Sequence, residues 1–289
     1  MDSQLVVGID VGGQTTKLGV VDARGTVLAQ TVIRTDTYST IEPYIAELAE
    51  AINKIIKDAD AEGKVRGIGV GAPNGNYYTG TIENAPNLPW GHNGVVEFAK
   101  LLSAAMNGLP VALTNDANAA AVGEMTYGAA RGMKNFIMIT LGTGVGSGIV
   151  INGEVVYGHD GFAGELGHTA AVRNNGRQCN CGKTGCLEAY ASATGVARTA
   201  REWLELTDEP SVLRNLDTIA SKDVYDAAKE GDKLALKIFD FTGRILGRSF
   251  ADFIAFSAPE AIVLFGGLAR AKEFLLAPME EAMNANLLP

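Results

Sequence analysis

The sequence predicts an α/β protein built from two related lobes. Its 289 residues correspond to about two domains of ordinary size. Short apolar runs that resemble buried strands alternate with longer segments of helical spacing, which is typical of an α/β architecture. In addition, the succession of strand, glycine turn, strand, short turn and strand occurs twice, about 130 residues apart, and this repeat favours two lobes of common design.

The first predicted lobe, residues 1–115, opens with three strands at residues 4–11, 16–22 and 26–34. Gly12-Gly13 separates the first two strands, and Ala23-Arg24-Gly25 forms the second turn. We expect Thr40 to cap a helix from residue 41 to about residue 61, because apolar residues recur there with helical spacing. The lobe then continues as a strand at 65–71, an irregular segment at 74–91, a helix at 94–106 and a strand at 110–114.

The second predicted lobe, residues 116–289, begins with a helix after Asp116 and then repeats the opening pattern. Strands at 136–141 and 145–151 flank a glycine turn, and Asn152-Gly153 is a hairpin signal before a strand at 154–157. After a polar loop that contains every cysteine, residues 187–206 and 232–256 have helical spacing. A buried strand at 261–265 ends at Gly266-Gly267, and a last helix follows.

The composition excludes several classes of protein. The chain is 47% hydrophobic and 20% charged, as globular proteins are, and its net charge is −9. This acidic balance argues against nucleic acid or an anionic membrane as the main partner, but a small phosphorylated ligand remains compatible with it. No apolar run reaches the length of about 18 residues that a membrane span needs, and the first residues lack the basic start of a signal peptide. We therefore expect a cytoplasmic protein.

The glycine turns predict places where a ligand approaches the backbone. Gly142, Gly144, Gly146 and Gly148 alternate with period two, so one face of that strand carries no side chains. Successive N–H groups in the matching turns form nests for anions, and a lysine adds a point charge. The hydroxyl-bearing and basic residues around the two turns are Thr15, Thr16, Lys17, Thr140, Thr143 and Ser147. The alternative, a bulged strand packed under a helix, stays open, and neither a P-loop nor a dinucleotide fingerprint is present.

Two carboxylates follow predicted strands and have candidate chemical roles. Asp10 ends the first strand beside its glycine turn, where it can bind Mg²⁺ directly or through water, or simply stabilise the turn. Asp116 follows the strand at 110–114. There it can accept a proton from an attacking hydroxyl, or it can cap the next helix, a role that Asn115 fills equally well.

The cysteine-rich segment predicts a zinc site. His168, Cys179, Cys181 and Cys186 have the spacing H-x10-C-x-C-x4-C and include all three cysteines of the chain. Three thiolates and one imidazole make a closed tetrahedral set, which is typical of structural rather than catalytic zinc. A disulfide framework is disfavoured, because it needs even numbers of cysteines spread along a secreted chain.

Five motifs together resemble the ROK family of repressors and sugar kinases, within the hexokinase–actin-like ATPase superfamily. They are G-I-D-V-G-G at 8–13, N-D-A-N-A-A-A-V-G-E at 115–124, L-G-T-G-V-G-S-G at 141–148, G-E-L-G-H at 164–168 and C-N-C-G-K-T-G-C-L-E-A-Y-A-S at 179–192. The combination is specific, and the match covers nearly the whole chain. The resemblance implies a two-lobed, ribonuclease H-like fold with a cleft that holds ATP on one side and a hexose on the other.

The resemblance also implies roles for individual residues, with Asp116 as the catalytic base and zinc bound by the cluster of His168 and three cysteines. Residues that resemble ligands of the sugar are Asn74, Gly75, Asn115, Asp116, Glu165, His168 and Glu188. Residues that resemble the ATP and Mg²⁺ region are Asp10, Gly12, Gly13, Thr15, Lys17, Thr143, Gly144, Gly266 and Gly267.

The activity implied by the resemblance is ATP-dependent phosphorylation of the 6-hydroxyl of a hexose. Glucose is favoured, because A-P-N-L-P-W at 85–90 resembles the pattern of glucose-using members. The alternatives are an N-acetylhexosamine, N-acetylmannosamine or fructose kinase, or a sugar-binding regulator without turnover. A DNA-binding repressor is not expected, since only nine residues precede Asp10. The family also implies a homodimer or a homotetramer.

Three positions depart from the family pattern. Gln14 stands where the family commonly has threonine, and Asn74 is an additional residue in a Pro-Gly loop that contacts the sugar. The chain ends at Pro289, where members usually continue through a further strand and helix, so we expect either a truncated chain or a different packing of its C-terminal end.

Overall fold

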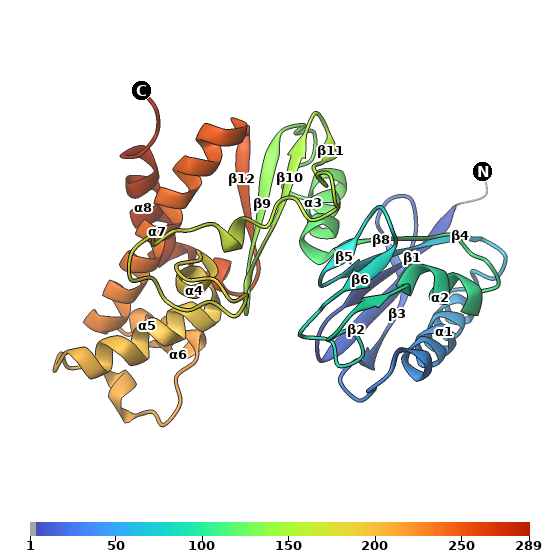
Figure 1. The fold of residues 1–289 in the computed structure, drawn as a ribbon, viewed down its shortest axis with the longest axis horizontal. Helices are drawn as coiled ribbons and strands as arrows, with labels where there is room; N and C mark the ends of the chain where they lie inside the picture. Colours follow the sequence, from blue (N-terminus) through green and yellow to red (C-terminus); the bar gives the residue numbers. More distant parts are fainter. Residues whose placement is uncertain (1–3) are drawn as a thin grey trace. The chain divides into compact units, whose positions relative to one another are not determined.

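The computed structural model describes residues 4–289 and divides into two compact units (Figure 1). Unit 1 comprises Met1–Gly132 and Val155–Ala163, and unit 2 comprises Met133–Glu154 and Gly164–Pro289. Residues 1–3, the start of the first predicted lobe, lie outside the described part. The predicted boundary between lobes, after residue 115, stays a prediction.

Unit 1 is built on a five-stranded sheet in the order β3-β2-β1-β4-β8. Strands β1 (Leu5–Val11), β2 (Thr15–Val21) and β3 (Val27–Arg34) form an antiparallel meander. Strands β4 (Val65–Ala72) and β8 (Val111–Asn115) extend the sheet in parallel with β1. Three parallel strands therefore end at the same edge of the sheet.

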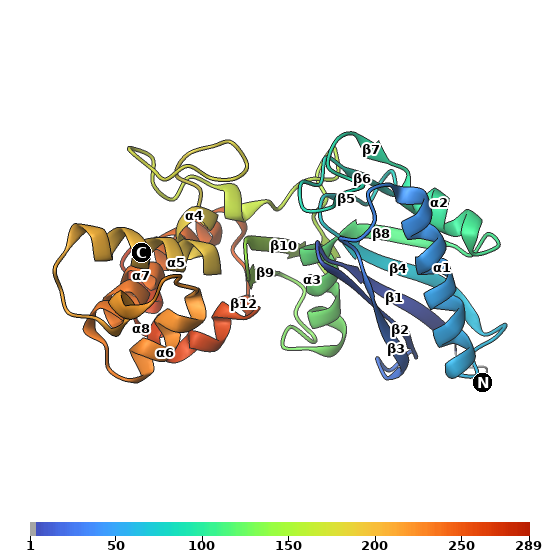
Figure 2. The ribbon, with the colours of Figure 1, turned by 90° about the horizontal axis from the view of Figure 1, so that it is seen from below.

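Helices cover both faces of this sheet, as Figure 2 shows for α1 (Ile41–Asp58), α2 (Phe98–Ala105) and α3 (Asp116–Tyr127). Alternate residues of β1 are buried in one core with α1 and α2. On the other face α3 approaches β4 closely. A Cβ added at Gly71 would lie only 3.1 Å from Ala119 Cβ, so the glycine makes this close approach possible. Thr40 occupies the N-cap of α1 without a side-chain capping bond, so the prediction that it caps the helix is wrong in that respect.

The predicted irregular segment at 74–91 holds β5 (Gly75–Asn76) and β6 (Thr81–Glu83), and β7 (Val95–Val96) completes a small antiparallel sheet with them. The prediction of a helix from residue 94 is therefore wrong at its start, because residues 95–96 pair with β6 and α2 begins only at Phe98. Residues 155–163 pack against this small sheet, where Asn76 Nδ2 donates a 2.9 Å hydrogen bond to the Asp160 carbonyl. These strands are two or three residues long, which is too short for a periodic pattern to reveal them.

Unit 2 contains a four-stranded sheet in the order β11-β10-β9-β12. Strands β9 (Phe136–Leu141) and β10 (Val145–Ile151) are antiparallel, β11 is Glu154–Val155, and β12 (Ala261–Phe265) runs parallel to β9. In each unit the third, second, first and fourth strands of the unit lie side by side in that order. This shared topology agrees with the repeat in the sequence and confirms the predicted α/β class.

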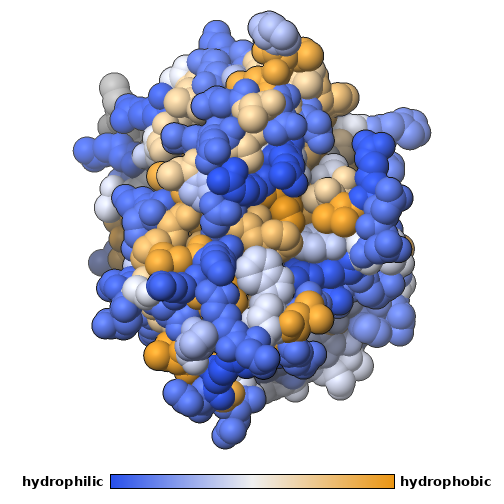
Figure 3. All heavy atoms as spheres, turned by 90° about the vertical axis from the view of Figure 1, so that its left-hand side faces the viewer, coloured by the Kyte–Doolittle hydropathy of each residue, from blue (hydrophilic) through white to orange (hydrophobic). Residues whose placement is uncertain are grey.

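The helices of unit 2 are α4 (Glu188–Ala191), α5 (Ala193–Leu206), α6 (Ser221–Lys229), α7 (Lys233–Ser257) and α8 (Lys272–Asn284). The single helix predicted at 187–206 is interrupted at Ser192, whose extended backbone lets its hydroxyl cap Gly195 N–H. Seen from the side of these helices, the surface is mostly hydrophilic with small apolar patches (Figure 3). Among residues 4–289, no helix has both the length and the apolar character needed to cross a bilayer.

Candidate active site and metal centre

The shared strand edge of unit 1 gathers most of the site residues predicted in that unit. The register pairs Asp10 with Gly71, and Ala72 with Asn115, across the parallel strands β1, β4 and β8. In parallel sheets, ligands bind beyond the carboxyl ends of the strands. The residues at or just beyond this edge are Asp10, Gly12, Gly13, Asn74, Gly75, Asn115 and Asp116.

Asp116 is the first helical residue of α3, and Asn115 is the cap. The Asn115 Oδ1 atom accepts the Ala117 N–H at 2.9 Å, and Asp116 Oδ1 accepts the same N–H at 2.8 Å. The Asp116 side chain reaches solvent, yet desolvation by the surrounding protein and the charge of Asp10 raise its pKa, against the Ala117 bond. A carboxylate with a raised pKa at a strand edge is suited to accept a proton.

The first glycine turn is closed by its own backbone. Gly12 N–H donates to the Thr15 carbonyl at 3.0 Å, and a Cβ at residue 12 would lie 2.8 Å from that oxygen. A Cβ at Gly13 would lie 2.9 Å from the Asn87 carbonyl, so the segment that carries the motif at 85–90 packs on this turn. Glycine is therefore required at both positions. Lys17 lies opposite Asp10 in the β1–β2 register, and its side chain is exposed.

Asn74 and Gly75 shape the loop that follows β4. Asn74 has a left-handed backbone (φ 52°), and its Nδ2 donates to the carbonyls of Glu83 and Asn84 at 2.9 and 3.0 Å. The amide group of Asn74 therefore holds the end of β6. A Cβ at Gly75 would lie 2.5 Å from the Thr114 carbonyl, which explains the glycine beside Asn115.

The glycine turn of unit 2 (residues 142–144) is fixed by α4 and α5, the helices that follow the cysteine loop (residues 173–186). Ala193 N–H donates to the Gly142 carbonyl at 2.8 Å, and the Thr194 hydroxyl donates to the Thr143 carbonyl at 2.9 Å. Val145 N–H donates to Glu188 Oε2 at 2.9 Å. These three hydrogen bonds hold the backbone of the turn in place, and the last of them places Glu188 beside it.

Gly266 places the Gly266-Gly267 pair beside the glycine turn at residues 142–144. Its backbone is left-handed (φ 100°), and a Cβ there would lie 2.5 Å from the Leu141 carbonyl. Because β9 and β12 are parallel, the turns that follow them leave the sheet at one edge. Within unit 2 the structure therefore brings together Thr143, Gly144, Gly266 and Gly267.

The four predicted zinc ligands converge in unit 2. The ligand atoms of His168, Cys179, Cys181 and Cys186 all lie within 4.8 Å of one another. The Cys179 Sγ to His168 Nδ1 and the Cys181 Sγ to Cys186 Sγ distances are both 3.7 Å. A tetrahedral zinc ion, with bonds of about 2.3 Å to sulfur and about 2.0 Å to nitrogen, needs neighbouring ligand atoms about 3.5–3.8 Å apart. The geometry and the donor set fit zinc.

The remaining predicted sugar ligands, Glu165, His168 and Glu188, lie just before and just after the cysteine loop. The 3₁₀ turn Leu166–His168 is held on β10, where Ser147 Oγ accepts the Leu166 N–H at 2.9 Å. Glu165 precedes this turn and His168 ends it, so both are placed by one short element. Glu188 Oε1 lies 3.7 Å from Cys179 Sγ, which connects this carboxylate to the metal ligands as well as to the glycine turn.

Sequence reasoning missed Asn87 and the arginine that anchors the cysteine loop, Arg177. Asn87 belongs to a motif that the sequence did reveal, so its contact with Gly13 could have been suspected. Arg177 lies in a polar loop and has the appearance of a solvated residue, yet its side chain is 9% exposed. Nothing in the local pattern distinguishes it from an exposed arginine.

Comparisons of the sequence and of the structure with known proteins all find members of the ROK family. The family model described as "ROK family" matches residues 6–288. A glucokinase of Halalkalibacterium halodurans is 38% identical over 100% of this chain and 88% of its own length. The crystal structure of a ROK family glucokinase from Streptomyces griseus with glucose and AMPPNP has a TM-score of 0.78 and 33% identity, over 99% of this chain and 90% of that one. A ROK family transcriptional regulator, homologous to the E. coli MLC protein, has a TM-score of 0.86 and 29% identity, over 99% and 71%.

Proposed function

The chain belongs to the ROK family, and on this premise we propose that it transfers the terminal phosphoryl group of ATP to the 6-hydroxyl of glucose. The proposal rests on the position of Asp116. Its carboxylate lies at the carboxyl edge of the parallel strands, where desolvation and the charge of Asp10 raise its pKa. The similarity to glucokinases along the whole chain supports glucose as the hexose.

Asp116 acts as the general base in this reaction. Its Oδ1 is held by the Ala117 N–H, so Oδ2 is the oxygen that accepts the proton of the 6-hydroxyl. Proton transfer to a positioned carboxylate makes the sugar oxygen a better nucleophile toward the γ-phosphorus of ATP. Positioning and charge stabilisation supply most of the remaining rate in phosphoryl transfer.

The phosphates and Mg²⁺ are assigned to the two glycine turns and Asp10. A carboxylate at the mouth of such a turn fits Mg²⁺, which prefers oxygen ligands and keeps several of its waters. When bound, the ion neutralises charge on the phosphates. In unit 1 the backbone around Gly13 and the cation Lys17 would bind phosphate oxygens. In unit 2 the backbone around Thr143 would bind phosphate oxygens, and Gly266-Gly267 is assigned to the adenosine.

We assign the sugar hydroxyls to the side chains of Asn115, Glu165, His168 and Glu188. The Asn115 Oδ1 is occupied by the helix cap, so its amide group is the donor to the sugar. Glu165 and Glu188 accept from sugar hydroxyls. His168 faces Cys179 through Nδ1, which leaves Nε2 as the nitrogen for the sugar.

Zinc is assigned to His168, Cys179, Cys181 and Cys186 as a structural ion. Desolvation by burial raises the pKa of the Cys179 thiol, so the thiolate requires a neighbouring cation. Bound zinc supplies rigidity to the loop and fixes the plane of the His168 ring. Thiols that bind zinc stay reduced in a reducing compartment, so we place the protein in the cytoplasm. A homodimer or a homotetramer is what the membership of the ROK family implies.

Phosphoryl transfer with a panel of hexoses tests this function. The purified chain is given ATP, Mg²⁺ and glucose, fructose, mannose, N-acetylglucosamine or N-acetylmannosamine, and the sugar phosphate is measured. We expect glucose to give the highest kcat/KM. The similarity to a transcriptional regulator keeps a second candidate, a sugar-binding regulator, which would bind glucose in calorimetry without turnover.

The Asp10→Ala variant is expected to raise the KM for ATP–Mg²⁺ by at least tenfold while leaving glucose binding nearly unchanged. The reason is that Asp10 is assigned to the metal on the phosphates and not to the sugar. Steady-state kinetics with varied ATP and Mg²⁺ measure the change. Asp58→Ala, which removes an exposed carboxylate at the end of α1, is the control of equal charge. Unchanged ATP kinetics in the Asp10 variant would refute this assignment.

The pH dependence of kcat/KM is expected to have an acid limb above the ordinary aspartate range. Desolvation raises the pKa of Asp116 in the folded protein above the 3.8 of an ordinary aspartate, so the proton-accepting form is lost as the pH falls through that raised value. The protonated Asp116 also contributes to folding stability, and this contribution is fully present below pH 3.8 and is lost as the pH rises through the raised folded-state pKa. A pH–rate profile measures the limb, and a limb at or below pH 3.8 would contradict Asp116 as a desolvated base.

A further inference from the structure

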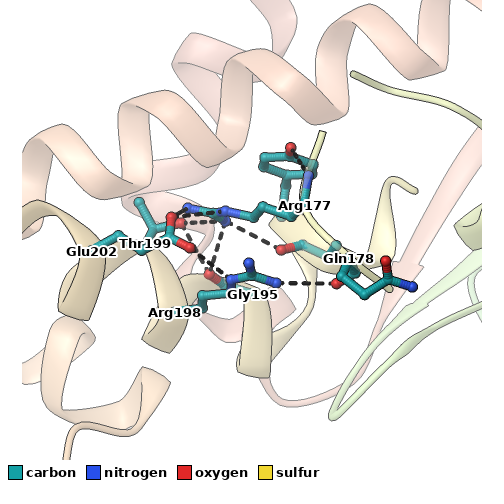
Figure 4. A network of polar contacts seen from close by, with 8 residues as sticks. Arg177, Gln178, Gly195, Arg198, Thr199 and Glu202 are labelled. Carbon is teal, nitrogen blue, oxygen red and sulfur yellow. Dashed lines mark hydrogen bonds and ion pairs between the residues drawn. The ribbon is translucent and has the colours of Figure 1, made fainter. Parts of the chain in front are cut away.

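Arg177 joins the cysteine loop to helices α4 and α5 through one buried guanidinium group. Its Nε and Nη2 atoms both donate to Glu202 Oε2, at 3.0 and 2.6 Å. Its Nη1 donates to Thr199 Oγ1 at 2.9 Å and to the Ala189 carbonyl at 3.2 Å. Figure 4 shows these contacts converging on Arg177 from neighbouring turns of helix.

The backbone and ring contacts of Arg177 add to this connection. Its N–H donates to the Tyr190 hydroxyl at 2.8 Å, and its guanidinium carbon lies 4.5 Å from the centre of the Tyr190 ring. Its carbonyl accepts the Gly185 N–H at 2.8 Å, which ties the two arms of the cysteine loop together. One residue therefore fixes the loop to the helices and also closes the loop on itself.

Because Arg177 is close to Cys179 in the sequence, its contacts also affect where the metal ligands lie. Arg177 precedes Cys179 by two residues, whereas Cys186 leads directly into α4. Cys179 N–H donates to the Lys183 carbonyl at 2.8 Å, so the turn that carries Cys181 is fixed from the same arm. The contacts of Arg177 with α4 and α5 thus set the position of Cys179 and Cys181 relative to Cys186.

A buried guanidinium needs an explanation, because its desolvation opposes its ion pair and apolar side chains often stabilise a fold equally well. Glu202 already has a second cation, since Arg198 Nε lies 2.7 Å from Glu202 Oε1. The ion pair alone therefore does not account for a buried Arg177. What Arg177 supplies in addition is a planar group with several donors in fixed directions, which specifies a geometry.

We propose that Arg177 is a positioning residue that assembles the thiol set before zinc binds. The inference rests on the proposed zinc site. A loop that is ordered in advance loses less conformational entropy when the ion arrives, so the ion binds more tightly. Arg177 makes every contact above with protein atoms.

The dissociation constant of zinc, measured with a competing chromogenic chelator on the full chain under reducing conditions, tests the proposal. Arg177→Met is expected to weaken zinc binding about ten- to a hundredfold, the range found for groups that orient metal ligands. Arg177→Lys is expected to weaken it less, because lysine keeps the charge but loses the planar fork. Arg214→Met is the matched control, since Arg214 fastens a different loop by bonds to the Leu204 and Glu209 carbonyls.

Hydrogen exchange of the zinc-free chain gives a second readout. The amides of Cys179 and Gly185 are expected to be protected in the parent protein and to lose protection in the Arg177 variants. If the parent chain binds no zinc, the proposed metal site fails. If the parent binds zinc and Arg177→Met binds it equally tightly, the metal site stands and the role of Arg177 is refuted.

Tyr190→Phe keeps the test decisive if Arg177→Met fails to fold. This variant removes only the hydroxyl that accepts the Arg177 N–H, and it retains the aromatic ring. A severalfold weaker zinc affinity supports the proposal, and an unchanged affinity overturns it. A purely structural role would lower the melting temperature of the zinc-free and zinc-loaded chains alike, with no change in affinity.

Discussion

Replacing Asp116 with asparagine is expected to lower kcat at least a hundredfold while the chain stays folded. Losing a positioned general base typically costs two or more orders of magnitude in rate. The fold should persist, because Asn115 provides the cap of α3 and asparagine at 116 can still accept the Ala117 N–H through its side-chain oxygen. Steady-state kinetics with saturating ATP and glucose, together with circular dichroism, measure both parts of the expectation.

Asp223→Asn is the matched control for this variant. Asp223 is also a carboxylate in the first turn of a helix, and its Oδ2 accepts the Ala220 N–H at 2.8 Å. The same chemical change at Asp223 should leave kcat unchanged. Near-parental turnover in Asp116→Asn would show that Asp116 is a helix-terminal residue without a role in proton transfer.

Replacing Cys181 with serine is expected to release zinc and to raise the KM for glucose by about ten- to a hundredfold. Without the ion, the His168 ring loses a bond that fixes its plane, and Glu188 loses a fixed neighbour in Cys179. The KM for ATP should rise less, because Ala193 and Thr194 still hold the turn at Gly142 and Thr143. Elemental analysis gives the zinc content, and kinetics under conditions where the variant is folded give both constants.

The control for the zinc prediction is Asn180→Ser, an exposed position between two of the ligands. It should keep about one zinc per chain and an unchanged KM for glucose. A parent chain without zinc would remove the whole expectation. A zinc-free Cys181 variant with an unchanged KM for glucose would leave zinc as a structural ion that has no influence on sugar binding.

The strands and turns of the sheets could be predicted because their signals are local. Strand β10 spans Val145–Ile151 and β12 spans Ala261–Phe265, at the predicted bounds. The helix α6 (Ser221–Lys229) was missed because it is short and most of its residues are polar, although Val224, Ala227 and Ala228 are buried with helical spacing. The interruption at Ser192 also escaped prediction, since Ser192 lies within an apolar spacing that continues on both sides.

The sequence by itself determined the family, the α/β class, the hexose kinase activity and the residues of the candidate metal site. These conclusions depend on motifs in which the informative residues are close in the chain. A glycine turn is recognisable because a Cβ would collide with backbone only a few residues away, as at Gly12. Similarly, His168 and the three cysteines lie within one loop, so their spacing already limits where they can be.

Only the tertiary structure decided which distant residues act on one another. Desolvation, together with the charge of Asp10, raises the pKa of Asp116. Asp10 and Asp116 follow strands of one parallel set, β1, β4 and β8, and no local pattern in the sequence gives that strand order. The structure also decided that Asn115 is the cap, and that Arg177 is buried against α4 and α5. The physical reason is that turns and caps depend on contacts within a few residues, whereas pKa shifts and buried ion pairs depend on which surfaces pack together.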